Sequence, residues 1–213
     1  MKMYLSSYKL GNHTDELLRL LGGNTKVGVI MAAQDYKNAD DRAVRLQAEL
    51  DDLKSLGLEP EELDLRQYFG TNRGLANRLE SYDLVWVRGG NAFVLRKALA
   101  QSGADKILTD LINDERIVYG GYSAAVCVLA PDLHGIELVD VENMYVPGYR
   151  PETIWQGLGL LPYSVAPHYK SDHYESDAID DAVAYFKTHN IPFKTLCDGD
   201  VLVIDGAKEK ILT

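Results

Sequence analysis

Residues 117–126, Ile-Val-Tyr-Gly-Gly-Tyr-Ser-Ala-Ala-Val, place one serine directly after a short apolar run and two glycines. Ser123 is followed by Ala124 and Ala125, which open a helical pattern. A sharp strand-to-helix turn exposes a serine hydroxyl, and small flanking residues let the strand and the helix approach each other, as in a nucleophile elbow. A helix start would also direct backbone N–H groups at a developing oxyanion. This run therefore predicts attack on an acyl carbon.

A simpler interpretation of the same run competes with the elbow. The pattern G-x-S-x-G needs a second glycine, and Ala125 stands in its place. Alanine is the next-smallest residue, so the turn can still form. A serine after a glycine turn is also a common N-cap of a helix. The run alone leaves both interpretations open.

A serine nucleophile needs a base, an acid behind the base and a second oxyanion donor. Residues 87–91, Val-Arg-Gly-Gly-Asn, end a neighbouring buried strand pattern. A glycine N–H there would lie at the carboxyl edge of the sheet, where ligands bind in α/β folds. The same run is explained by a plain turn with Asn91 as the next helix cap.

Five histidines could supply the base. Three of them fall in loops or at a helix end and are expected at the surface: His13, His134 and His189. His168 differs, because a short apolar run, 164–166, and Pro167 lead directly to it. Asp198 precedes a glycine between two late strand patterns and is the candidate acid, although a turn residue would also explain it.

A metal site is the main alternative in this region. His173 follows His168 by five residues, with Asp172 and Glu175 beside it, and imidazole with carboxylate suits zinc or iron. The spacing matches no H-E-x-x-H or cysteine–histidine pattern. A flavin or nucleotide site would need a G-x-G-x-x-G or P-loop run, which the chain lacks. We therefore expect no metal and no organic cofactor.

Composition excludes several classes of protein. The 213 residues are 46% hydrophobic and 25% charged, as in a folded globular chain. The sum of 22 basic and 32 acidic residues gives a net charge of −10, which argues against binding to nucleic acid or to an anionic membrane. The two cysteines form no C-x-x-C pair, and neither a signal peptide nor a membrane-length apolar run is found. These features predict a cytoplasmic protein.

Strand and helix patterns alternate about every 30 residues in the first half of the chain, which predicts a parallel α/β sheet with helices on both faces. The expected strands are 4–6, 27–31, 63–65, 84–87 and 117–119. The expected helices are one capped by Thr14, 40–56, one around Leu75 and Leu79, 93–111 with a break near Gly103, and a start at 123–129.

The second half is less regular. Residues 135–163 are expected to form surface loops or a β-excursion, followed by a strand at 164–166 and a helix at 177–189 capped by Ser176. Three short strands, 193–196, 201–204 and 210–212, are separated by Asp-Gly turns. No repeat or boundary divides the chain, so a single domain, 1–213, is expected.

The ordered set of short motifs resembles the dipeptidase E (aspartyl dipeptidase) family of serine peptidases, including its cyanophycinase-like relatives. The matching pieces are Gly89-Gly90-Asn91, Gly121-Tyr122-Ser123-Ala124, Pro167-His168-Tyr169 and Asp198-Gly199. Residues 171–176 look like an uncharacterised bacterial peptidase subgroup. The resemblance covers nearly the whole chain. It implies a three-layer αβα fold with a mainly parallel sheet, flavodoxin-like and related to class I glutamine amidotransferases, with a C-terminal β-hairpin.

The resemblance also implies roles for particular residues. Ser123 matches the nucleophile and His168 the general base, while Asp198 falls where the family has an acid, often Glu. Gly90 and Ala124 match the positions whose N–H groups form the oxyanion hole. The order Ser, His, Asp differs from the Ser, Asp/Glu, His order of α/β-hydrolases.

Two neighbours of the oxyanion glycine, Gly89 and Asn91, are expected to contact substrate. The chain departs from the family at Ala125, where glycine is usual, and at Ala92, where Thr is common. Neither departure removes a group with a predicted role.

The expected function is a serine peptidase that hydrolyses short peptides or a small amide through an acyl-enzyme. A non-catalytic, binding member of the same fold is the alternative, and a homodimer is left open. Aspartyl selectivity would need a cation beside the nucleophile. Arg88 and Arg150 are candidates, but the sequence does not place either of them there, so it does not predict a preference for aspartate.

Overall fold

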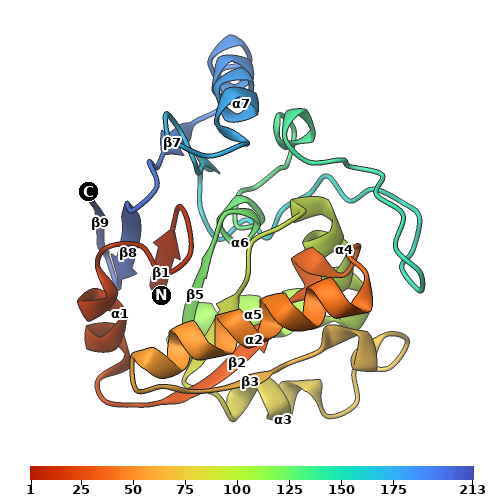
Figure 1. Ribbon diagram of the computed structural model, residues 1–213, viewed down its shortest axis with the longest axis vertical. Coiled ribbons are helices and arrows are strands. Elements are labelled where there is room, and N and C mark those ends of the chain that lie inside the picture. The colour runs from red at the N-terminus through yellow and green to blue at the C-terminus, as the bar shows by residue number, and fades with distance from the viewer.

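A computed structural model describes residues 1–213 and has a seven-stranded sheet at its centre (Figure 1). The strand order is β3-β2-β4-β5-β1-β8-β9. The strands are β1 (Lys2–Ser6), β2 (Lys26–Ile30), β3 (Glu59–Glu62), β4 (Leu84–Val87), β5 (Val118–Tyr122), β8 (Val201–Asp205) and β9 (Lys208–Leu212). The pairs among the first five are parallel, whereas β8 is antiparallel to β1 and forms a hairpin with β9. The predicted α/β class, mainly parallel sheet and C-terminal hairpin are confirmed.

Helices cover both faces of this sheet, because its central strands are apolar on both sides. In β4, Leu84 and Trp86 pack with α1 (Thr14–Leu21) and α2 (Ala39–Ser55). Val85 and Val87 face the opposite core, to which all the remaining helices contribute. These are α3 (Leu75–Glu80), α4 (Ala92–Ser102), α5 (Ala104–Asn113), α6 (Ala124–Cys127) and α7 (Ser176–Thr188). In Figure 1, α2 crosses in front of the strands.

A smaller unit carries the late histidines. Strands β6 (Ser164–Ala166) and β7 (Phe193–Thr195) pair in parallel as a separate two-stranded sheet. Helix α7 (Ser176–Thr188) connects them and lies at the top of Figure 1, away from the main sheet. Before β6, residues 131–163 are mostly loop, with one 3₁₀ turn, η3 (Ile136–Leu138). The loop expected there is confirmed.

One strand was predicted in the wrong place. Residues 63–65 are not a strand: the chain pairs with β2 earlier, at β3, and Leu65–Tyr68 form a 3₁₀ turn, η2. Strand β3 is an edge strand with the sequence Glu-Pro-Glu-Glu, so it shows no apolar pattern. The side chain of Asp64 accepts a hydrogen bond from the N–H of Arg66 and starts the turn instead.

The two predicted helix caps are also displaced. Thr14 and Ser176 are the first residues of α1 and α7, and the cap positions belong to His13 and Glu175, neither of which caps through its side chain. The break at Gly103 is confirmed, since Gly103 separates α4 from α5 in a left-handed conformation.

The longest helix, α2, has 17 residues. None of the helices combines the length and the apolar composition that crossing a membrane requires.

Candidate active site

A cavity of about 330 Å³ opens at the carboxyl ends of β1, β2, β4 and β5. Strands β2 and β4 are neighbours, and the chain leaves them in opposite directions along the sheet: β2 is followed by β3 on one side, and β4 is followed by β5 on the other. The direction of strand addition therefore reverses between β2 and β4. Crevices at such switch points are the usual ligand sites of open α/β sheets. The cavity is lined by the loops after those strands and by part of the segment 168–175. Residues central to its chemistry are Gly89, Gly90, Ser123, His168, His173 and Glu175.

Ser123 occupies a strained turn between β5 and α6. Its backbone has φ 54° and ψ −115°, a conformation that residues other than glycine rarely adopt. Such a conformation costs about 1–3 kcal/mol, and it concentrates at functional sites. The side chain makes no capping hydrogen bond and lines the cavity. The geometry therefore favours the elbow over the N-cap interpretation.

Gly121 explains how the turn accommodates Ala125. A Cβ on Gly121 would lie 2.7 Å from the Cβ of Ala125 and 2.3 Å from the carbonyl oxygen of Val87. Because Gly121 has no side chain, there is room for alanine at position 125, where the motif G-x-S-x-G has its second glycine. The departure at Ala125 is compatible with the tight turn.

Two unengaged N–H groups belong to the residues expected to form the oxyanion hole. The backbone N–H groups of Gly90 and Ala124 donate no hydrogen bond to other backbone groups. Gly89 lies against the serine, because a Cβ on it would be 2.9 Å from the Cβ of Ser123. Donors of this kind can stabilise the negative oxygen of a tetrahedral intermediate.

His168 is buried and hydrogen-bonded to Asp198. The distance from His168 Nδ1 to Asp198 Oδ1 is 2.7 Å, and the imidazole side chain is only 2% exposed. Burial lowers the pKa of His168 below its ordinary value, and the hydrogen bond to Asp198 opposes this effect. The carboxylate accepts a hydrogen bond from Nδ1–H of the neutral ring, which leaves the Nε2 lone pair free to accept a proton.

The structure does not join Ser123 to His168 by a hydrogen bond, although both line the same cavity. In enzymes without bound substrate, the bond between nucleophile and base is often long and forms only in the complex. Of the three predicted catalytic residues, His168 and Asp198 are thus in direct contact, and Ser123 lies in the same cavity as His168.

A hydroxyl that the sequence analysis overlooked holds the His168–Asp198 pair in place. Ser7, directly after β1, accepts a hydrogen bond from the N–H of His168 (2.8 Å) and donates one to Asp198 Oδ1 (2.9 Å). Ser171 Oγ accepts a bond from the N–H of Asp198 (2.7 Å). A polar residue immediately after a buried strand, at the carboxyl edge, is the sequence signal that points to Ser7.

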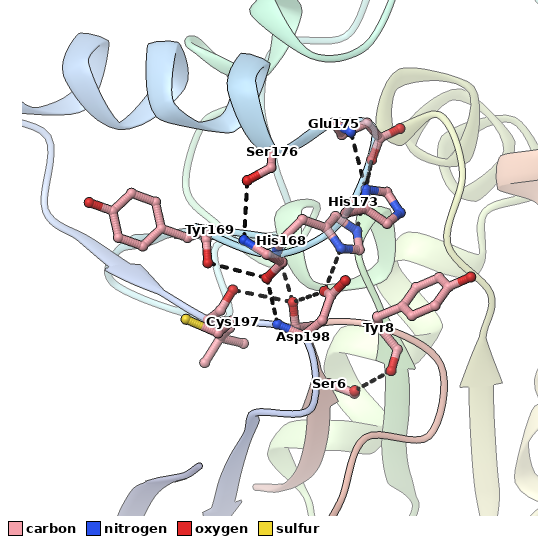
Figure 2. Close-up of polar contacts among 12 residues, drawn as sticks. Ser6, Tyr8, His168, Tyr169, His173, Glu175, Ser176, Cys197 and Asp198 are labelled. Atoms are coloured by element: carbon pink, nitrogen blue, oxygen red, sulfur yellow. Dashed lines mark hydrogen bonds and ion pairs between the residues drawn. The ribbon is translucent and has the colours of Figure 1, made fainter.

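His173 and Glu175 complete the polar side of the cavity. The rings of His168 and His173 stack with their centroids 3.7 Å apart and their planes 6° apart. Figure 2 shows His168 with Asp198 at one edge of its ring and His173 on its face. Glu175 Oε2 lies 3.8 Å from His168 Nε2, and the ring of Tyr8 contacts both histidines edge-on.

The cavity is rich in cations, which composition alone could not locate. Lys9, Lys37, Arg45 and Arg88 line it, and Glu175 is the one carboxylate among the lining residues. The first three cations form no ion pair within the protein, whereas Arg88 pairs with Glu49. Arg150, the other cation considered from the sequence, does not line the cavity.

Glu49 lies buried beneath this wall and fixes two lining residues. It accepts hydrogen bonds from Arg88 Nε (2.9 Å), Tyr122 Oη (2.9 Å) and Trp86 Nε1 (2.6 Å). Burial raises the pKa of Glu49, and these three donors oppose that effect. Arg88 is therefore held as a rigid donor at the cavity wall.

Asn91 lies outside the cavity lining. Its Oδ1 accepts from the N–H of Val94, and its Nδ2 donates to the carbonyl oxygen of Val141. Both polar ends of the buried side chain are occupied, which favours the helix-cap interpretation. Gly89 does line the cavity. The other three histidines, His13, His134 and His189, are not among the lining residues.

Comparison with known proteins identifies the family. The sequence profile of peptidase family S51 matches residues 9–212. The chain belongs to this family. The resemblance inferred from the ordered motifs is confirmed.

Individual relatives match over part of their length. An uncharacterized peptidase of Listeria monocytogenes is 32% identical over 120 residues, which are 56% of this chain and 55% of that protein. Peptidase E of Streptomyces coelicolor is 28% identical over 134 residues, 61% of this chain and 51% of that protein. The chain thus spans about half the length of the curated relatives that it matches.

A crystal structure of another protein has the same fold as this chain. A protein of Listeria monocytogenes EGD-e assigned as peptidase E superposes with a TM-score of 0.80 over 99% of this chain and 97% of that chain, at 23% identity. Similarity at this level of identity supports the αβα fold.

Proposed function

We propose that this S51 family member is a serine peptidase that hydrolyses short peptides through an acyl-enzyme. The observation that carries the proposal is a strained serine and a carboxylate-bound imidazole that line one cavity at the carboxyl edge of the sheet. Family membership supports peptidase chemistry. The two unengaged N–H groups near Ser123 support acyl transfer in particular.

The reaction begins at Ser123 Oγ, which attacks the scissile carbonyl carbon while His168 Nε2 takes the hydroxyl proton. Asp198 stabilises the imidazolium through Nδ1–H, and the N–H groups of Gly90 and Ala124 bind the oxyanion. The C–N bond then breaks, and the proton on Nε2 leaves with the amine. Water, deprotonated by the same nitrogen, attacks the ester, and Ser123 recovers its proton as the acid product departs. No step requires a metal or an organic cofactor.

A fluorophosphonate probe tests the nucleophile directly. We expect the folded protein to displace fluoride and gain one phosphonyl group at Ser123, because only an activated serine reacts readily with this reagent. Intact-mass and peptide mass spectrometry measure the addition. Ser123→Ala should abolish it, whereas Ser81→Ala, at an exposed serine outside the cavity, should not. Absence of labelling, or labelling that survives Ser123→Ala, would remove the assignment.

The same experiment separates the enzyme from the non-catalytic alternative when dipeptides are assayed beside it. A probe-reactive serine together with dipeptide turnover supports the peptidase. A pocket that binds dipeptides but neither hydrolyses them nor reacts with the probe supports a binding protein.

The charge of the cavity indicates the class of substrate. Three cations without ion-pair partners, Lys9, Lys37 and Arg45, share the cavity with Ser123. A carboxylate that enters this space gains attraction that its amide isostere does not. We propose that the peptidase favours short peptides with an acidic side chain, a preference that the sequence alone did not predict.

Arg45→Glu should lower kcat/KM for an aspartyl dipeptide by about 3- to 10-fold, because charge reversal at a solvated position costs on the order of 1 kcal/mol. The asparaginyl counterpart should change little, and added salt should reduce the difference. Arg150→Glu makes the same charge change outside the cavity and serves as the control. Equal effects of the two variants on the aspartyl substrate would contradict the preference.

A further inference from the structure

Three side chains at one end of the cavity form a set that suits a metal ion. The ligand atoms of His168, His173 and Glu175 lie within 4.8 Å of one another. Glu175 Oε2 is 3.8 Å from His168 Nε2 and 3.8 Å from His173 Nδ1. Two imidazoles and one carboxylate with an open fourth position are a donor set that zinc accepts, whereas calcium and magnesium prefer oxygen ligands.

The spacing is close to what zinc requires. Bonds of about 2.0–2.1 Å in a tetrahedral site separate ligand atoms by about 3.4 Å. Each 3.8 Å distance in the structure must therefore shorten by a few tenths of an ångström, and the two imidazole nitrogens, which lie within 4.8 Å of each other, must reach the same spacing. His173 and Glu175 lie in the turn that leads into α7, with side chains 11% and 18% exposed, so a solvated ion can reach them from the cavity.

Both imidazoles present a suitable nitrogen. His168 donates Nδ1–H to Asp198, and a carboxylate behind a histidine fixes the tautomer that leaves Nε2 for a metal. His173 Nδ1 accepts a hydrogen bond from the N–H of Glu175, at 3.2 Å, so this nitrogen carries a lone pair that a metal could bind. A metal ion would replace that donor. A ring nitrogen binds a metal in the plane of its own ring, and the two ring planes are stacked only 6° apart, so the ring of His173 must turn out of the stack for both nitrogens to reach one ion.

We propose that His168, His173 and Glu175 bind one zinc ion reversibly and that the bound ion blocks peptide hydrolysis. The binding is a property of the three side chains alone, and the block rests on the proposed function. His168 Nε2 must accept the proton of Ser123 Oγ, and a lone pair committed to zinc cannot do so. The ion is therefore an inhibitor that competes with catalysis for one nitrogen atom.

Zinc binding is measured by isothermal titration of the chelator-treated full chain, and hydrolysis and fluorophosphonate labelling are followed at the same zinc concentrations. We expect one ion per chain, loss of both rate and labelling as the site fills, and recovery with chelator. His173→Ala and Glu175→Gln should each weaken zinc binding more than about 10-fold, because even an outer partner of a metal ligand contributes about 10- to 100-fold to affinity. Inhibition is compared with the metal-free rate of each variant.

His189→Ala is the matched control, since it removes an exposed histidine at the end of α7 and leaves all three ligands. Its zinc affinity should equal that of the unmodified chain, and magnesium should not inhibit. Absence of binding, binding unchanged in both ligand variants, or a rate that rises with zinc would overturn the proposal. Binding without peptide turnover would preserve the zinc site and contradict only the peptidase, which the labelling experiment decides independently.

Discussion

Replacing Ser123 with alanine is expected to lower kcat/KM for peptide hydrolysis by about 10⁴- to 10⁶-fold, the loss seen when the nucleophile of a serine hydrolase is removed. The hydroxyl has no structural bond to lose, because Ser123 makes no capping hydrogen bond. The fold should therefore remain, and circular dichroism with a thermal melt checks it. Turnover close to that of the unmodified chain would show that another group attacks the carbonyl.

A second substitution at the same position distinguishes strain from chemistry. Ser123→Gly removes the same hydroxyl but also relieves φ 54°, a conformation that costs a non-glycine residue about 1–3 kcal/mol. Glycine loses part of this gain through the greater entropy of its unfolded chain. We expect a net stabilisation of about 1 kcal/mol, or a melting temperature about 2–4 °C higher, with no activity. Ser123→Ala should show no such rise.

The strained turn at Ser123 also illustrates why the strand-to-helix turn can be predicted from the sequence. A buried strand, paired glycines and small residues are local signals, and they are needed wherever a strand turns sharply into a helix. Strands such as β2 and β4 were predictable for the same reason, since burial on both faces demands continuous apolar runs. The family followed from the order of the motifs.

The sequence does not predict features that depend on the pairing of distant strands. Strand β3 has no apolar pattern because it lies at the sheet edge, so the strand predicted at the apolar run 63–65 is wrong. Strand β7 pairs with β6 and not with β8 across Asp198-Gly199, which no turn signal reveals. This pairing is what brings Asp198 back to His168, 30 residues earlier.

The charges of the cavity depend on the same long-range arrangement. Lys9, Lys37, Arg45 and Arg88 follow or lie in different elements, and of the four only Arg88 is a candidate cation from the sequence. The sheet brings the carboxyl ends of β1, β2 and β4 to one edge and α2 packs over it, which places the four cations around one crevice. A chain with net charge −10 can therefore present a locally cationic site. Ser7 escaped notice for a related reason, because its partners His168 and Asp198 are 161 and 191 residues away.

Asp198→Asn is the second substitution with a large expected effect. Loss of the carboxylate charge should lower kcat/KM by about 10³- to 10⁴-fold, because the imidazolium formed in the transition state loses its stabilising partner and the neutral tautomer is no longer fixed. Ser7→Ala keeps the charge and removes only the hydroxyl that orients Asp198. Its loss should be smaller, about 10- to 100-fold, as for misplacement of a catalytic group by a fraction of an ångström to one ångström. Steady-state kinetics on one dipeptide ranks the two variants.

The pH profile separates charge from position. Hydrolysis needs neutral His168, so kcat/KM falls as the pH drops through the pKa of that ring. The hydrogen bond to Asp198 is the largest effect that raises this pKa against burial. Removing the carboxylate therefore lowers the pKa, and in chelator-containing buffer the acid limb of Asp198→Asn should move to lower pH. The limb of Ser7→Ala should not move down, because the charge remains. An acid limb that stays in place in Asp198→Asn would mean that another carboxylate, with Glu175 the nearest candidate at 3.8 Å from Nε2, sets the ionisation of His168.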